Sequence, residues 1–164
     1  LKFSNTLALE RCLGWTGLLV EASPTNFARL QKANRKAHAE HAAICPAGES
    51  LRFADGLGKG RGGEQAHSID TYATRPRLQS AVTTVPCQPL GALLGTHNLS
   101  RVHLLVLDVE GSEWTAIQTV DVSVFSIILV ELDGTNKTKD SKVHDYILNQ
   151  GLVFARYMPS TPNR

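Results

Sequence analysis

Aromatic residues make up only 6% of this 164-residue chain, and its formal net charge at pH 7 is only +2. Proteins that bind nucleic acids usually carry a basic patch and, for single strands, aromatic side chains on which bases stack. The basic residues here are scattered, with loose groups at 29–36 and 137–142. No apolar run reaches the roughly 20 residues of a membrane-spanning helix, and the first residues do not resemble a signal peptide. We therefore expect no nucleic-acid partner and no membrane span in this chain.

Cysteine and metal-ligand motifs are also scarce. The three cysteines, Cys12, Cys45 and Cys87, form no CxxC motif, and their odd number leaves at least one unpaired. A scaffold built on disulfides is therefore not expected. His38 and His41 lie three residues apart at the end of a predicted helix, a spacing that permits metal ligation, but no third ligand accompanies them. We expect solvated histidines and no metal site.

Two further motifs have ordinary explanations. The glycine-rich stretch at 56–63, GLGKGRGG, is not a Walker sequence and is not placed between a strand and a helix, so it indicates a surface loop. The tripeptides Asn98-Leu-Ser100 and Asn136-Lys-Thr138 are acceptor sequences for N-linked glycans. They matter only if the protein enters the secretory path, and such tripeptides also arise by chance. The sequence leaves the compartment open.

What the sequence does contain is an alternation of helix and strand patterns. Apolar residues are 42% and charged residues 20% of the chain, as in ordinary globular domains, and the length suits a single domain over 1–164. Several apolar runs lack the period-two alternation of a half-exposed strand, which favours an open, mostly parallel α/β sheet flanked by helices. The predicted helices cover 3–15, 23–38, 89–97, 112–120 and 141–150. Ser4 or Asn5 caps the first of them and Gly14 ends it, and Ser23 caps the second. The predicted strands cover 16–22, 42–45, 50–55, 81–88, 102–109, 125–132 and 152–158.

Three of the predicted strands end in acidic residues, and ligands of open parallel sheets bind outside the carboxyl ends of the strands. Glu21 follows one strand, Asp108 and Glu110 follow the apolar run LLVL, and Glu131 and Asp133 follow IILV. A carboxylate in the position of Glu21 suits the two hydroxyls of a ribose. It could equally cap the next helix or face solvent, and the spacing does not decide between these interpretations.

The segment DVEGSE after the strand at 102–109 is the densest acidic cluster in the chain. Asp108 directly follows a buried strand, so we expect it to contact a ligand or a helix N-terminus. Gly111 allows a sharp turn and the close approach of a ligand to the backbone. Glu113 has a simpler explanation, because acidic residues in the first turn of a helix interact favourably with the helix dipole.

The segment VHLLVLDVEGSEWTAIQTV resembles the signature of the FkbM-type methyltransferases, whose core reads approximately DLLKIDVEGxExxVL. Further segments are similar to other parts of the family pattern: GLLVEASPTNFARLQKANRK, AICPAGESLRF, VPCQPLGALLGTH, IILVELDG and VHDYILNQGLVF. The resemblance implies a Rossmann-like class I methyltransferase fold that uses S-adenosylmethionine. It also implies O-methylation of a sugar or small-metabolite hydroxyl, so the expected acceptor is a small molecule or a glycan.

The resemblance also implies roles for individual residues. Glu21 matches the family's ribose-binding acid, and Asp108 and Glu110 match the DVE at the mouth shared by cofactor and acceptor. We therefore predict Glu21, Asp108 and Gly111 as cofactor-binding residues and Asp108 and Glu110 as catalytic residues. Methyl transfer needs alignment and the removal of one proton. Asp108 or Glu110 could take that proton or could hold the acceptor.

The sequence departs from the family pattern at its front. The family places a strand and a DxGAxxG turn before the helix at 3–15, and this chain starts inside that helix. We expect a domain that is incomplete at its N-terminus, without its first strand, and also at its C-terminus. Gln88 and His103 replace usual family residues as well. An alternative is therefore an inactive methyltransferase-like domain that serves as an interaction subunit, with a protein partner covering the open sheet edge.

Overall fold

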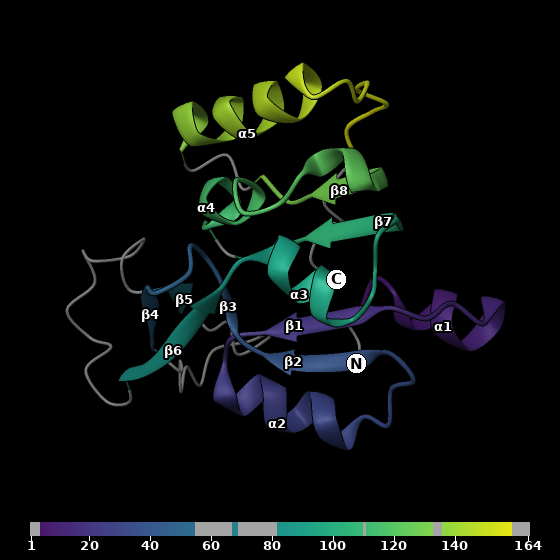
Figure 1. Ribbon diagram of the computed structural model, residues 1–164, viewed down its shortest axis with the longest axis vertical. Coiled ribbons are helices and arrows are strands. Elements are labelled where there is room, and N and C mark those ends of the chain that lie inside the picture. Colours follow the sequence, from purple (N-terminus) through teal and green to yellow (C-terminus); the bar gives the residue numbers. More distant parts are fainter. Residues whose placement is uncertain (1–3, 55–66, 69–81, 110, 133–135, 159–164) are drawn as a thin grey trace.

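The computed structural model describes residues 4–54, 67–68, 82–109, 111–132 and 136–158. The predicted loop at 56–63 and the acidic residues Glu110 and Asp133 lie outside this part of the chain. Helices and strands alternate along most of it, which confirms a mixed α/β fold (Figure 1). Every helix in the described ranges is too short or too polar to cross a bilayer.

From residue 82 to residue 149, the order of elements follows the sequence prediction. The helices are α1 (Leu7–Leu13), α2 (Pro24–Lys32), α3 (Leu90–Thr96), α4 (Glu113–Ile117) and α5 (Lys137–Asn149), with a 3-10 turn at Val122–Val124. The strands are β1 (Leu18–Glu21), β2 (His38–His41), β3 (Ala43–Ile44), β4 (Ser50–Ala54), β5 (His67–Ser68), β6 (Val82–Gln88), β7 (Val102–Leu107) and β8 (Phe125–Val130).

The strands form three separate sheets among the described residues, whereas the sequence predicted one mostly parallel sheet. β1 and β2 pair in parallel, β7 and β8 pair in parallel, and a four-stranded sheet has the order β3-β6-β4-β5 with antiparallel pairs around β4. β1 and β7 share no hydrogen-bonded neighbour there. Even so, the arrows of four strands, β1, β2, β7 and β8, point the same way in Figure 1. The carboxyl ends of these strands therefore lie on the same side of the molecule.

The main hydrophobic core lies around the β7–β8 pair. It contains fully buried Ile117 and Val143 from α4 and α5, Leu90 and Leu94 from α3, and Leu107 at the end of β7. Leu18 of β1 packs against this core, which ties the β1–β2 pair to it. Beside α4 and α5, the ring of Trp114 meets that of Tyr146 edge-on, with centroids 5.7 Å apart. The carboxyl end of β7 therefore rests on a well-packed base.

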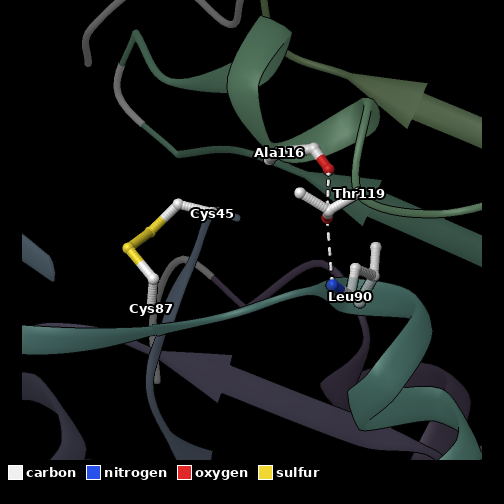
Figure 2. The surroundings of a disulfide bond; sticks show 5 residues. All are labelled: Cys45, Cys87, Leu90, Ala116 and Thr119. Carbon is white, nitrogen blue, oxygen red and sulfur yellow. Dashed lines mark hydrogen bonds between the residues drawn. A yellow bond between two sulfur atoms is a disulfide. The ribbon is translucent and has the colours of Figure 1, made fainter. Parts of the chain in front are cut away.

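A disulfide joins Cys45, just after β3, to Cys87 in β6 (Figure 2). The two Cα atoms are 5.0 Å apart, both residues are buried, and Val85 packs beside them. The sequence argued against a scaffold built on disulfides, and a single bridge is consistent with that. The pairing itself was not predictable, because the parallel register of β3 with β6 brings together residues that are 42 positions apart. Cys12 is exposed and has a free thiol.

Thr119 links the start of α3 to the end of α4 (Figure 2). Its Oγ1 accepts a hydrogen bond from the Leu90 N–H at 3.0 Å and donates one to the Ala116 carbonyl at 2.7 Å. The Thr119 carbonyl accepts a third bond, from the Gly91 N–H at 3.1 Å. Pro89, the N-cap residue of α3, makes no side-chain hydrogen bond to the helix. Thr119 therefore provides the hydrogen-bond acceptors for the first N–H groups of α3 that a local cap residue normally provides.

The helix α2 begins as predicted and ends earlier. Ser23 is its N-cap and accepts a hydrogen bond from the Asn26 N–H, with Pro24 at the first helical position. The prediction extended the helix to residue 38, and this is wrong: the last helical residue is Lys32, and Asn34 has a positive φ of 51°. Residues 38–41 instead form β2 alongside β1, a long-range pairing that overrides the local helical pattern.

The Glu10 side chain connects α1 to the segment after α2 by hydrogen bonds and an ion pair. It is only 5% exposed, and its carboxylate accepts hydrogen bonds from the Lys36 N–H and from Arg35 Nε, each at 2.9 Å. The Lys36 N–H, followed by the Arg35 guanidinium, holds the pKa of Glu10 below its usual range, although burial acts in the opposite direction. The helix thus depends on a buried ion pair.

The start and the buried side of α1 differ from the prediction. Its N-cap residue is Thr6, not Ser4 or Asn5, and the hydroxyls of Ser4 and Thr6 accept hydrogen bonds from the Arg35 guanidinium at 3.1 Å. Gly14 ends the helix as predicted, with a positive φ of 68°. The expected apolar side is largely exposed, at Ala8, Cys12 and Leu13.

The predicted last strand is not formed. Residues 152–158 have no regular secondary structure, and Val153, Phe154, Tyr157 and Met158 are exposed. The apolar pattern of LVFARYM was typical of a strand, but a strand needs a hydrogen-bonded neighbour, and within the described residues β8 pairs only with β7. Phe154 instead contacts the His144 ring on α5, with ring centroids 5.7 Å apart.

Candidate functional site

The candidate site is the side of the molecule to which the carboxyl ends of β1, β7 and β8 point. β7 ends at Leu107, which is buried, and Asp108 follows as an exposed residue. The β7–β8 ladder extends one residue further, because the Glu131 N–H donates to the Leu107 carbonyl at 2.9 Å. Asp108 therefore stands at the rim of the sheet, with its backbone anchored by the strand before it.

The turn after Asp108 is held by Glu113. Gly111 has a φ of 102°, a conformation that favours glycine, and its N–H donates to Glu113 Oε1 at 2.8 Å. Glu113 is 2% exposed although it is charged. Its second oxygen, Oε2, pairs with Lys139 Nζ at 2.6 Å, and Lys139 comes from the first turn of α5. One buried carboxylate thus joins the turn to a helix that follows β8.

The sequence did not reveal this role of Glu113. The helix-dipole interpretation accounted for an acidic residue at the start of α4, but not for its burial or its partner. Lys139 lies 26 residues away. The available signal was the closeness of Gly111 and Glu113, because a glycine turn followed by a carboxylate allows the side chain to return to the turn's own N–H group.

Glu21 occupies the end of β1, as predicted. It is half-buried, and its Oε1 accepts a hydrogen bond from the Ser23 N–H at 2.8 Å. Because Ser23 caps α2, the carboxylate of Glu21 fixes the turn between β1 and α2. This contact matches the interpretation of Glu21 as a residue that supports the next helix, and it also sets the orientation of the carboxylate. A role in ribose binding stays a prediction.

The structure brings some of the predicted residues together and leaves others apart. Gly111 and Glu113 meet in one turn, directly after Asp108. Among the described residues, Glu21 ends a strand of one sheet and Asp108 follows a strand of another, and the two strands point the same way in Figure 1. Glu110 lies outside the described residues, so its predicted role is unchanged.

His38 and His41 do not have the placement that the sequence predicted. In the part of the chain that the structure covers, no group of three or more His, Cys, Asp or Glu side chains is arranged to hold a metal ion. His38 and His41 lie on β2, not on a helix end, and both are exposed. The His41 ring stacks on Phe27, with ring centroids 4.8 Å apart. The His38 ring lies tilted against the His97 ring, with centroids 4.9 Å apart.

Comparison with known protein families supports the resemblance. The family model described as the methyltransferase FkbM domain matches residues 2–154. This range covers nearly the whole chain and includes Glu21, Asp108, Glu110 and Gly111. No curated protein and no solved structure matches the chain significantly.

Proposed function

The chain belongs to the FkbM methyltransferase family, as its DVEGSE segment implied, and on this premise we propose that it transfers a methyl group from S-adenosylmethionine to a hydroxyl oxygen of a sugar or small metabolite. The observation that carries the proposal is the family match over residues 2–154. The arrangement of the strands supports it, because two acidic residues, Glu21 and Asp108, stand at carboxyl ends that point to the same side of the molecule.

The residues present suit the cofactor. A ribose offers two hydroxyl donors, and a carboxylate at the end of a parallel strand offers acceptor oxygens. Glu21 is half-buried and oriented by the Ser23 N–H, so less side-chain freedom is lost when it binds. When bound, the cofactor would supply a methyl group that is already activated on a sulfonium sulfur.

Asp108 would act on the acceptor. Its exposed carboxylate can accept the proton of an acceptor hydroxyl or hold a neighbouring hydroxyl in place, and Glu110 is the second candidate for either task. The buried contact between Glu113 and the Gly111 N–H fixes the turn that follows. Glu113 and Lys139 are therefore positioning residues in this proposal, since they act through the turn.

The proposal includes a completed sheet. In the described part of the chain, β1 pairs only with β2 and β7 only with β8. The three apolar residues of β1 and most residues of β7 are only half-buried. A parallel strand from outside the described residues, inserted between β1 and β7, would join the two pairs into one Rossmann-like sheet and cover these apolar residues.

Cofactor binding by Glu21 variants of the whole protein tests the cofactor role. Glu21→Ala removes hydrogen bonds to a charged acceptor, which are worth about 1 to 3 kcal/mol, so the Kd for S-adenosylmethionine should rise about 5- to 150-fold in calorimetry. Glu49→Ala removes an exposed carboxylate after β3 and serves as the matched control. An unchanged Kd in a folded Glu21→Ala protein would refute the ribose role.

Asp108→Asn tests the acceptor role. The amide keeps the size of the side chain but cannot take a proton, so methyl transfer from labelled S-adenosylmethionine to a panel of sugars and hydroxylated metabolites should fall about 100-fold or more. The Kd for S-adenosylmethionine in the same variant tests the predicted cofactor contact of Asp108 separately: a raised Kd supports that contact, and an unchanged Kd confines Asp108 to the acceptor. If the methyl-transfer rate is retained in both Asp108→Asn and Glu110→Gln, neither residue is the base.

A further inference from the structure

The turn between α3 and β7 presents one of the two glycan acceptor tripeptides on the surface. Asn98 follows the C-terminal end of α3 with a positive φ of 57°, which asparagine tolerates better than most residues. Its N–H donates to the Gly95 carbonyl at 3.0 Å, and the Leu99 N–H donates to the Leu94 carbonyl at 2.8 Å. The backbone of the tripeptide is therefore fixed by the helix end.

The side chains of this tripeptide divide between core and solvent. Leu99 is half-buried and packs on the main core, whereas Asn98 and Ser100 on either side of it are exposed. Within the described residues, neither the Asn98 amide nor the Ser100 hydroxyl has a hydrogen-bond partner. The helix end explains why asparagine suits position 98, but nothing in the fold requires a hydroxyl at position 100.

The disulfide is an independent indication of the compartment. Disulfides form and persist mainly in secreted, luminal and periplasmic proteins, and the Cys45–Cys87 bridge is buried inside a packed cluster. Attachment of N-linked glycans also takes place in such a compartment. The bridge and the exposed tripeptide therefore point to the same route.

We propose that Asn98 carries an N-linked glycan. In the reaction, Asn98 Nδ2 forms a bond to the anomeric carbon of an oligosaccharide carried on a lipid pyrophosphate. The bond from that carbon to the pyrophosphate oxygen breaks, and the amide loses one proton as the lipid pyrophosphate leaves. The exposed position of the side chain leaves room for the sugar in the folded protein.

The position of Asn98 separates the glycan from the candidate site. Asn98 lies four residues before Val102, at the amino end of β7, whereas Asp108 follows the carboxyl end of the same strand. The second acceptor residue, Asn136, lies after β8 on the side of the candidate site, and its Oδ1 already caps α5 by accepting from the Lys139 N–H. The glycan at Asn98 would leave the site open. The inference does not depend on the proposed methyltransferase activity.

A peptide map of the protein from its natural source tests both parts at once. Trypsin cuts after Lys36, Arg52, Arg77 and Arg101, so the peptides 37–52 and 78–101 carry the two bridged cysteines, and the second peptide also contains Asn98. Before reduction they should appear as one linked species. Glycan removal by an amidase in heavy-oxygen water should convert Asn98 to labelled Asp. An unmodified Asn98, or labelling at Asn136 alone, would overturn the proposal.

Variants at Ser100 provide a second test that leaves Asn98 and its backbone contacts intact. In the whole protein expressed through a eukaryotic secretory path, Ser100→Ala should remove the mobility shift caused by the amidase at this position. Ser100→Thr, which keeps the acceptor sequence, should retain the shift. Equal shifts for Ser100→Ala and Ser100→Thr would show that Asn98 is not modified.

Discussion

The buried pair of Glu113 and Lys139 gives the sharpest prediction for stability. The side chains are only 3% and 14% exposed, and their charged atoms are 2.6 Å apart. Lys139→Met keeps most of the length of the side chain but removes the ammonium group. The Glu113 carboxylate would then remain buried without its cation, and breaking such a pair from one side typically costs about 3 to 5 kcal/mol.

This cost is large against the total stability of a domain, which is typically about 5 to 15 kcal/mol. With a urea slope of about 2 kcal/mol/M, a loss of about 3 kcal/mol lowers the unfolding midpoint by about 1.5 M. Urea unfolding followed by tryptophan fluorescence suits this measurement, because Trp114 lies next to Glu113 and contacts α5 through Tyr146. Lys139→Arg, which retains a cation, is the control and should shift the midpoint much less.

The double variant Glu113→Gln/Lys139→Met separates charge burial from lost packing. Both charges are removed, so the neutral amide at position 113 needs no cation beside it, while its side-chain oxygen can still accept from the Gly111 N–H. The double variant should therefore be more stable than Lys139→Met alone, with a coupling energy of about 1 to 3 kcal/mol. If Lys139→Met shifts the midpoint by less than about 0.5 M, which corresponds to about 1 kcal/mol, the reasoning is refuted. It is also refuted if the stability loss of the double variant equals the sum of the losses of the two single variants.

Three further predictions follow from the fold. Replacing Cys45 and Cys87 by alanine opens the loop closed by residues 42 positions apart and should cost about 4 kcal/mol in urea unfolding, whereas Cys12→Ser should cost almost nothing. Thr119→Val keeps the shape but removes the acceptor at the start of α3, so it should cost about 1 to 3 kcal/mol, and Thr119→Ser should restore most of that. The pKa of Glu10 is lower in the folded state than in the unfolded state. The Glu10 carboxylate therefore contributes fully to folding stability above its unfolded-state pKa, and this contribution is lost as the pH falls through its folded-state pKa. Glu10→Gln should therefore lower the urea midpoint near neutral pH, and the gap to the unaltered protein should narrow below about pH 4; a constant gap would contradict this assignment.

The sequence predicted best those elements whose signals are local. Ser23 and Pro24 mark the start of α2, Gly14 marks the end of α1, and the unbroken apolar runs mark β7 and β8. Each of these signals acts through neighbouring backbone groups or through burial of a short run, so it does not depend on distant partners. The position of Asp108 at the end of β7 followed from the same local pattern.

The features that were missed all depend on partners far away in the chain. β2 reads as a continuation of α2 until β1 is placed beside it, and LVFARYM reads as a strand although it lacks a partner among the described residues. The burial of Glu113 depends on Lys139, 26 residues further on. A single sequence shows local propensity, whereas the choice of partner depends on tertiary packing.

The disulfide also changes the covalent connectivity of the chain. Together with the backbone between them, Cys45 and Cys87 close a covalent ring that contains β4, β5 and most of β6. A single cut of the backbone anywhere in this ring would leave the protein in one piece, and the two fragments would separate only after reduction. The ring would therefore keep β3 and β6 connected even after a protease had cut the chain between them.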